Sequence, residues 1–304
     1  MRIVDPHHHL WDRDLHPYPW LAAPTVSGLV GDTTPLCRNY LLADLKADAA
    51  SVELVKSVHL QAEIAHDLSV EETRWLQSIA DAPGSGGFPH GIVAYADLPD
   101  PQVDRTLAAH ALAKAACGIR QILNRHPDPG VNFVDRDYMA EDQWQQGFAR
   151  LRAHGLSFDM QLYAPQMADG AATARRHPDP QIIINHTGMP LDRDPEGLAA
   201  WRGGMRALAA CPNVAVKISG LGMVDHHWTV DSIRPFVLET IDMFGTTRCL
   251  FASNFPVDKL FSDYATVWGA FGQITADFST AERNSLFHDN AVRLYDLEYH
   301  EPAG

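Results

Sequence analysis

The chain has 304 residues, of which 46% are hydrophobic and 20% are charged. This composition excludes a disordered or fibrous chain and suits one large α/β domain or two ordinary ones. The formal net charge is −14, and no Lys/Arg cluster could follow a phosphate backbone, so nucleic acid is not an expected partner. No apolar stretch approaches the ~20 residues of a membrane helix, so no membrane association is expected.

The first predicted strand begins too early to leave room for a signal peptide, which predicts a cytoplasmic protein. The four cysteines are far apart and form no CxxC pair, which favours reduced thiols over a disulfide framework or a thiolate zinc site. They are Cys37, Cys117, Cys211 and Cys249.

An unusual run, Asp5-Pro6-His7-His8-His9, lies where the first strand should end. Alternate side chains of a strand share a face, so His7 and His9 point the same way and His8 points away, toward a packing role. Two such imidazoles form half of a metal site or a general-base pair. The alternative is a pair of hydrogen-bonded core histidines.

Residues 12–37 are irregular, rich in proline and too long for an ordinary connection. We expect an ordered loop there. Its aromatic residues and the adjacent Trp11, together with Tyr18 and Trp20, form either a wall over a pocket or the anchor of the loop itself.

Short β-like runs then alternate with longer helical segments to the end of the chain. After the first strand, strands are expected at 55–60, 91–96, 118–123, 156–162, 181–185, 214–219 and 249–252. Helices are expected at 70–82, 102–116, 137–154, 165–177, 195–211 and 231–244. Many of these helices begin at capping or acidic residues and end at Gly or Pro.

Eight such units in one chain predict a single (β/α)8 TIM barrel that forms one domain over residues 1–304. A doubly wound open sheet is the alternative. A nucleotide-binding sheet of that kind should carry GxGxxG or a P-loop after an early strand, and neither motif occurs at the first turn.

The carboxyl ends of barrel strands form the active site, and polar residues occur there on strand after strand. Buried parallel strands should be apolar, so a polar residue at every second position indicates a polar pocket. Alternatively, some of these residues face outward and form ion pairs or caps. The residues are His59, Gln61, Glu63, Arg120, Asp159, Gln161, Tyr163, His186, Lys217 and Ser219.

His186 ends an apolar strand on the same rim as His7 and His9, which predicts a cluster of three imidazoles. Three neutral imidazoles can hold Zn²⁺ and leave a position for a water molecule whose pKa falls to about 7. A carboxylate usually completes such a site. The eighth strand instead ends in Ser253-Asn254-Phe255-Pro256.

These segments resemble the amidohydrolase superfamily, within it the lactonase-like group that includes fuconolactonase and 2-pyrone-4,6-dicarboxylate lactonase. The resemblance spans nearly the whole chain. It is carried by the opening Asp-Pro-His-His-His-Leu-Trp, the strand ends at 185–188 and 217–220, the turn at 253–256 and the closing Asn-Ala-Val-Arg-Leu-Tyr at 290–295.

The resemblance implies a barrel with His7, His9 and His186 at its carboxyl rim, where family members hydrolyse esters, lactones or amides. It implies one divalent metal ion, with zinc the best match to imidazole ligands, or no metal, because the group contains metal-free members. It also implies a homo-oligomer.

Most family members carry an aspartate at the position of Asn254, where it orients or deprotonates the attacking water. An asparagine cannot accept that proton at neutral pH. Either another acid, namely Glu63, Asp159 or Asp258, has taken over, or Asn254 binds metal or water through its amide oxygen, or the chain is not hydrolytic.

The leading hypothesis is a hydrolase that opens the lactone or ester of a small sugar-acid or carboxylated compound with activated water. His7, His9 and His186 would polarise the carbonyl as zinc ligands or direct donors. Substrate oxygens would be bound by residues from several strands. This predicted substrate-binding set is His59, Gln61, Arg120, Gln161, Tyr163, Lys217 and Asp258.

Two other functions stay open from the sequence. A metal-dependent decarboxylase of an aromatic acid would use a similar metal site, with the aromatic loop covering a flat ring. A non-catalytic sugar-acid binding barrel would explain Asn254.

Overall fold

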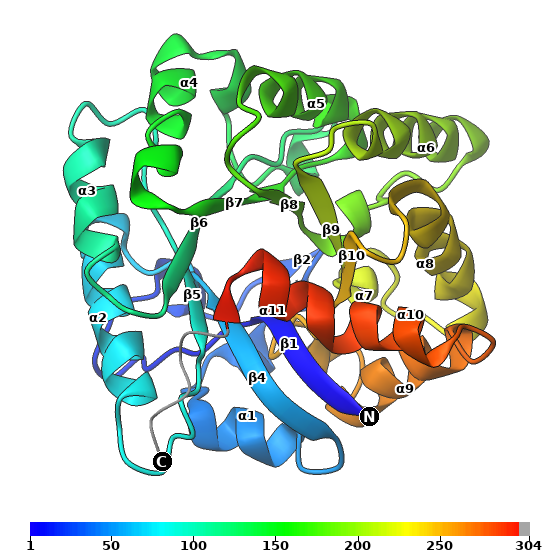
Figure 1. The fold of residues 1–304 in the computed structure, drawn as a ribbon, viewed down its shortest axis with the longest axis horizontal. Coiled ribbons are helices and arrows are strands. Elements are labelled where there is room, and N and C mark those ends of the chain that lie inside the picture. Colours follow the sequence, from blue (N-terminus) through cyan, green and yellow to red (C-terminus); the bar gives the residue numbers. More distant parts are fainter. Residues whose placement is uncertain (298–304) are drawn as a thin grey trace.

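The computed structural model describes residues 1–297. Eight parallel strands form a nearly closed barrel in sequence order, and helices surround it (Figure 1). The predicted (β/α)8 barrel is therefore confirmed, and the open doubly wound sheet, whose strand order would reverse, is wrong. Of the predicted domain, residues 298–304 lie outside the described residues.

All eight predicted strands are present, with small shifts at their ends. Their cores are rich in Ile, Val and Leu, which suit a sheet buried on both faces. The barrel strands are β1 Arg2–His8, β4 Glu53–Leu60, β5 Gly91–Ala94, β6 Ala116–Ile122, β7 Ser157–Gln161, β8 Ile182–Ile184, β9 Val214–Ile218 and β10 Cys249–Phe251. A separate antiparallel hairpin pairs β2 Val26–Ser27 with β3 Gly31–Asp32.

The barrel closes between β1 and the segment that follows β10. The backbone N–H of Asn254 donates to the carbonyl of His7 at 2.8 Å, and the N–H of His9 donates to the carbonyl of Phe255 at 2.7 Å. An isolated parallel bridge joins His8 to Phe255 at the same place. The seam therefore passes through the residues that were predicted to form the site.

Strand alternation divides the side chains into two layers. One layer packs between the sheet and the outer helices, for example Phe158 and Met160. The other fills the barrel interior with single residues from successive strands, including Val93, Ile183 and Leu250. The interior is a packed core and not a pore.

The C-terminal segment covers the end of the barrel where the strands begin. Helix α11 lies across that end in Figure 1, and Ala291, Val292, Tyr295 and Leu297 join the interior cluster. The opposite end, at the carboxyl ends of the strands, is left for the cavity described below.

Four α-helices, α6, α8, α9 and α10, begin at residues whose side chains cap them. Asp194 accepts hydrogen bonds from Glu196 N and Gly197 N at the start of α6, and Pro195 holds its first position. The α-helices are α1 Leu42–Asp48, α2 Ser69–Ala80, α3 Val103–His110, α4 Asp142–Phe148, α5 Met167–Arg176, α6 Pro195–Ala209, α7 Leu221–Val224, α8 Val230–Phe244, α9 Tyr264–Ile274, α10 Thr280–Asn284 and α11 Asn290–Leu294.

Short helical turns connect these elements. The 3₁₀ turns are η1 Pro19–Leu21, η2 Thr34–Leu36, η3 His66–Leu68, η4 Pro129–Val131, η5 Tyr138–Ala140, η6 Leu151–His154, η7 Ala164–Gln166, η8 His186–Gly188 and η9 Asp258–Leu260, and η10 Ser285–Asp289 is a π-helical turn.

Two predicted helices are too long. The helix predicted at 102–116 is α3, which ends at His110; beyond it Ala113 N bonds to the carbonyl of His110, three residues back, and Ala115 N bonds to the side chain of Gln77. The helix predicted at 137–154 is broken into η5, α4 and η6 around an extended Glu141. The prediction also omitted α9, although Asp263 caps it and its apolar residues follow a helical period.

Residues 12–37 contain η1, η2 and the β2–β3 hairpin, and Trp20 donates from its indole N–H to the carbonyl of Ala62 at 2.8 Å. The segment is thus held against the barrel by specific contacts. The four cysteines are free thiols. No helix among residues 1–297 has the length and apolar character to span a bilayer.

We expect Gly147→Ala to destabilise the barrel by several kcal/mol, because a Cβ at this position in α4 would overlap the backbone of Leu98. Gly203→Ala in α6 is the matched control, since a Cβ there meets nothing within 4 Å. That change should stabilise the protein by about 0.5–1 kcal/mol. Urea unfolding of both variants checks this, and equal effects would contradict it.

Candidate active site

A cavity of about 350 Å³ lies at the carboxyl ends of the strands. Its floor is made by side chains from the strand ends, and loops form its walls. Of the predicted site residues, six line it: His9, Glu63, Arg120, Gln161, His186 and Asn254.

The three predicted histidines come together beside this cavity. The ring centroid of His7 is 5.2 Å from that of His9 and 4.5 Å from that of His186. All three rings are buried. The cluster joins the end of β1 to the turn after β8, as the sequence predicted.

In two of these rings, His9 and His186, a hydrogen bond to a protein oxygen occupies the Nδ1 atom. His9 Nδ1 lies 2.8 Å from the carbonyl of Leu60, so it donates there and leaves Nε2 free to accept. His186 Nδ1 lies 3.1 Å from Ser219 Oγ. Both ring nitrogens of His7 are buried without a hydrogen-bond partner in the described residues.

The surroundings keep these imidazoles neutral. Burial is the largest cause that lowers the pKa of His7, His9 and His186 well below 6.5. The positive charge of Lys217 lowers the pKa of His7 and His186 further, and that of Arg120 lowers the pKa of all three. Neutral imidazole is the form that binds metals and accepts hydrogen bonds.

The donor set matches zinc chemistry, although no three His, Cys, Asp or Glu side chains among residues 1–297 are arranged to hold a metal ion together. Two imidazoles with their Nδ1 atoms bonded to protein oxygens have the second-shell pattern of metal ligands. The unpartnered nitrogens of His7 supply a further donor. A bound metal is thus chemically compatible with these residues.

Asn254 lies between His9 and Asp258. Its side-chain amide raises the pKa of His9 and lowers that of Asp258, so it is in electrostatic contact with both. Burial of the Asp258 carboxyl outweighs the effect of Asn254 and raises its pKa from 3.8 to about 7. Asp258 does not itself line the cavity.

Glu63 is the only one of the three proposed replacement acids that lines the cavity. Its Oε1 accepts from Gln61 Nε2 at 2.5 Å, and its Oε2 lies 3.4 Å from His66 Nε2. Burial raises the pKa of Glu63, but His66, Arg120 and Gln61 together lower it below 4.5. The carboxylate is therefore ionised at neutral pH.

Arg120 is a buried guanidinium on the cavity floor. It donates to the carbonyl of Gln61 at 2.6 Å and to Gln161 Oε1 at 3.3 Å. Its Nε makes no hydrogen bond, and no carboxylate of residues 1–297 lies within ion-pair distance of it. A cation held this way is suited to bind an anionic oxygen.

Asp159 and Lys217 lie in the barrel interior and do not line the cavity. Lys217 Nζ donates to Asp159 Oδ1 at 2.5 Å, and the Tyr295 hydroxyl donates to Asp159 Oδ2 at 2.8 Å. Asn185 Nδ2 donates to Oδ1 as well, at 2.8 Å. With these partners, Asp159 is not free to take a proton from water, and Lys217 is not free to bind a substrate.

Three other predicted substrate ligands lie outside the cavity lining. His59 accepts from Leu10 N at 3.0 Å on the outer face of β4, and the hydroxyl of Tyr163 donates to the carbonyl of Val131 at 2.7 Å. Gln61 orients Glu63 and holds Arg120 through its carbonyl. Its role is thus support of the residues that line the cavity.

Comparison with known proteins agrees with this geometry. The amidohydrolase family model matches residues 4–297. The chain belongs to the amidohydrolase family. Membership of this family identifies the protein as a hydrolase.

This amidohydrolase is 48% identical to the uncharacterized protein y4mH of Sinorhizobium fredii, over 96% of this chain and 98% of that protein. It is 29% identical to an L-fucono-1,5-lactonase of Burkholderia multivorans, over 99% of this chain and 97% of that one. A crystal structure of an amidohydrolase from Burkholderia multivorans with bound zinc aligns with a TM-score of 0.79 at 27% identity, covering 97% of this chain and 99% of that one.

Three residues of the cavity share an unusual backbone conformation. Glu63, His186 and Asn254 have φ values of 54°, 54° and 58°. Non-glycine residues adopt this left-handed region rarely, and such strain gathers at functional sites. In this amidohydrolase the strained turns follow β4, β8 and β10, and each turn aims a side chain into the cavity.

Sequence reasoning missed most of the cavity wall. Val30, Phe133, Val134, Met223 and Val257 line it from loops whose path cannot be read from periodicity. Gly220 was noted in the sequence only as the last residue of the family-like segment 217–220, without a role of its own. A Cβ there would lie 2.5 Å from the His186 ring, so glycine is needed to admit that ring.

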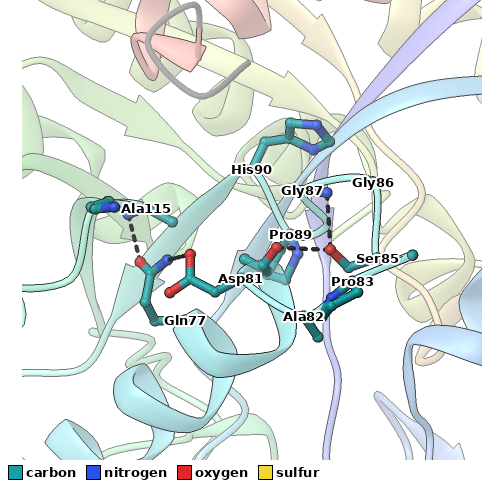
Figure 2. Close-up of a pocket in the computed structure, with 13 residues that line it drawn as sticks. Gln77, Asp81, Ala82, Pro83, Ser85, Gly86, Gly87, Pro89, His90 and Ala115 are labelled. Atoms are coloured by element: carbon teal, nitrogen blue, oxygen red, sulfur yellow. Dashed lines mark hydrogen bonds between the residues drawn. The ribbon is translucent and has the colours of Figure 1, made fainter. Parts of the chain in front are cut away.

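A larger cavity of about 630 Å³ lies at the other end of the barrel, near the starts of β5 and β6 (Figure 2). Several of its polar side chains bond to one another and to backbone, as Gln77 does with Asp81 and Ala115. None of the predicted site residues lines it. Its size alone does not make it the active site of this amidohydrolase.

Asp258→Asn tests the environment beside Asn254. The folded protein holds the Asp258 proton more tightly than the unfolded chain does, because its pKa is raised from 3.8 to about 7. The stability that this carboxyl contributes is therefore complete below pH 3.8 and is lost as the pH rises through 7, by up to about 4 kcal/mol. The variant should lack this loss.

We expect the melting temperature of Asp258→Asn relative to the unmodified protein to rise by several degrees between pH 4 and pH 8. Asp231→Asn is the control, because that side chain is exposed on α8. Its difference from the unmodified protein should stay constant over this range. A constant difference for Asp258→Asn as well would contradict the raised pKa.

Proposed function

We propose that this amidohydrolase opens small lactones, or hydrolyses small esters, by attack of an activated water molecule on the carbonyl carbon. The proposal depends on one observation: a cluster of three neutral imidazoles, of which His9 and His186 line the cavity, lies beside the guanidinium of Arg120. Similarity to an L-fucono-1,5-lactonase over nearly the full length supports the same class of reaction.

Arg120 would bind the substrate oxygens. Its guanidinium lines the cavity, and its fixed contacts to Gln61 and Gln161 make it a preorganised donor for the oxyanion that develops on the carbonyl. Because the site is buried, this interaction is stronger than it would be in water. The same guanidinium also suits the carboxylate that ring opening creates.

Glu63 would accept the proton of the attacking water. It lines the cavity and is ionised at neutral pH, whereas Asn254 has no basic atom for this task. Asn254 would orient the water through its amide oxygen. Asp159 is excluded as the base by its bonds to Lys217, Tyr295 and Asn185.

In the complete step, the water oxygen bonds to the carbonyl carbon and one water proton passes to Glu63. The bond between that carbon and the ring oxygen then breaks, and the leaving oxygen takes the proton back from Glu63. The product is a hydroxy acid, which releases its acidic proton to solvent. No oxidant or second substrate is required.

His7, His9 and His186 are the residues whose donor atoms suit one divalent metal, zinc being the ion that imidazole ligands favour, and they would hold it after their rings reorient, since their present arrangement does not bring three donors together. Such an ion supplies a Lewis acid for the carbonyl and lowers the pKa of a water molecule. The zinc in the similar Burkholderia multivorans structure supports this assignment. Without an ion, His9 and His186, which line the cavity, would act on the substrate directly.

Glu63→Gln should lower kcat for lactone hydrolysis by about 100-fold or more, the usual contribution of a general base. Glu71→Gln, at an exposed position on α2 outside the cavity, is the control and should keep full activity. Initial rates measured on a lactone panel with a pH indicator test this. Loss of activity in Asp258→Asn with retention in Glu63→Gln would assign the base to Asp258 instead.

His186→Ala should remove bound zinc. We expect about one zinc per chain in untagged protein that has been stripped with chelator and reloaded, and less than a tenth of that in the variant. His154→Ala, which alters an ion pair with Asp104 far from the cavity, should bind zinc as before. Elemental analysis measures this, and a zinc-free unmodified protein would overturn the metal assignment.

A further inference from the structure

The cavity is polar at one end only. Arg120, His186 and Asn254 at the floor are all at most 4% exposed and come from strand ends. The walls come from the loops that rise above them, including the β2–β3 hairpin and the segment between η4 and η5. Any substrate that reaches the floor must therefore lie against these loops.

The loop residues that form the wall are mainly apolar. Val30 comes from the hairpin, Phe133 and Val134 from the segment before η5, Met223 from α7 and Val257 from the turn before η9. Phe133 is 42% exposed, which is unusual for a large aromatic side chain. The wall thus offers apolar surface to whatever enters.

Aromatic faces complete the wall. The His66 ring stacks on the Tyr95 ring at 3.9 Å with an angle of 20° between the planes. Trp20 also lines the cavity, and its indole N–H is already bonded to the carbonyl of Ala62. It therefore contributes a ring surface without a free donor.

Several polar groups of the wall are also occupied by protein partners. Gln121 donates from Nε2 to Asp97 at 3.2 Å and accepts from Trp144 Nε1 at 2.8 Å. Glu63 is held by Gln61 and His66. Tyr95 and Tyr138, each with a hydroxyl group, also line the cavity, but most of the wall surface is apolar.

We infer that the substrate of this amidohydrolase is a lactone or ester with an apolar body, alkyl or aromatic, whose only strongly polar part is the acyl group at Arg120. This inference rests on the proposed function and names its substrate class. A polyhydroxylated sugar lactone would bury hydroxyl groups against Val30, Phe133 and Met223. Each hydroxyl left without a partner weakens binding by about tenfold.

The test compares δ-lactones that share one ring size. δ-Nonalactone carries an alkyl chain, dihydrocoumarin carries an aromatic ring, and glucono-δ-lactone carries hydroxyl groups. Each kcat/KM is divided by the uncatalysed hydrolysis rate of the same lactone, which removes differences in intrinsic reactivity. We expect the two apolar lactones to exceed glucono-δ-lactone by at least about 100-fold.

Binding is measured separately by calorimetry with the hydroxy acids that the lactones would give. If no lactone is hydrolysed but the apolar acids bind and gluconate does not, the proposed function fails and the substrate class stands. If glucono-δ-lactone is hydrolysed faster, or gluconate binds more tightly, the substrate class is overturned and the hydrolase stands. Failure of every lactone and every acid overturns both.

Phe133→Gln should reduce the preference for δ-nonalactone over glucono-δ-lactone by about fivefold or more, since it replaces apolar wall by an amide. Val134→Thr is a second, smaller change on the same wall. Leu112→Gln is the control, because Leu112 is 83% exposed and lies outside the cavity. An unchanged preference in both wall variants would contradict the role of the wall.

Discussion

The seam that closes the barrel is also the framework of the active site. Two backbone hydrogen bonds, from Asn254 to His7 and from His9 to Phe255, join the first strand to the turn after the last one. The residues in these bonds include two of the three clustered histidines and the asparagine beside them. Any change that opened the barrel here would therefore disperse the site, since the geometry of the imidazoles depends on closure.

The interior of the barrel shows how a polar residue can be buried without being available for chemistry. The Asp159 carboxylate accepts hydrogen bonds from Lys217, Tyr295 and Asn185. Its charge is thus balanced by Lys217, and both of its oxygens are hydrogen-bonded. Removing one partner would leave a buried charge, which is the costly case for such pairs. The neighbouring Arg120 has no such carboxylate partner and faces the cavity. Lys217 is therefore a structural cation, whereas Arg120 is suited to bind a ligand.

Much of this arrangement could be predicted from the sequence. Strand alternation and the β/α order place His7, His9 and His186 on one rim, and the structure brings them together. Alternation cannot decide which of two faces points inward, because a period of two gives both faces equally. For this reason His59 was predicted beside the substrate but lies on the outer face, while Val58 and Leu60 fill the interior.

The sequence also could not predict how deep in the barrel a polar side chain lies, or which distant segments contact it. Asp159 was predicted to lie in the polar pocket as a possible replacement acid, but it is buried in the barrel interior below the cavity. Nothing near it in sequence indicates that Tyr295 reaches it from the opposite end. Glu63 reaches the cavity because its own backbone is in a strained left-handed conformation, with a φ of 54°. Such contacts are non-local, and local patterns carry no information about them.

The contact between Tyr295 and Asp159 also orders events during synthesis. Residue 295 leaves the ribosome after every strand has been made, so the buried pair of Asp159 and Lys217 lacks its last hydroxyl donor until then. Helix α11, which covers the same end of the interior core, is made together with Tyr295. A nascent chain can thus form its strands and outer helices early, but its interior core is completed only after residues 291–297 have been made.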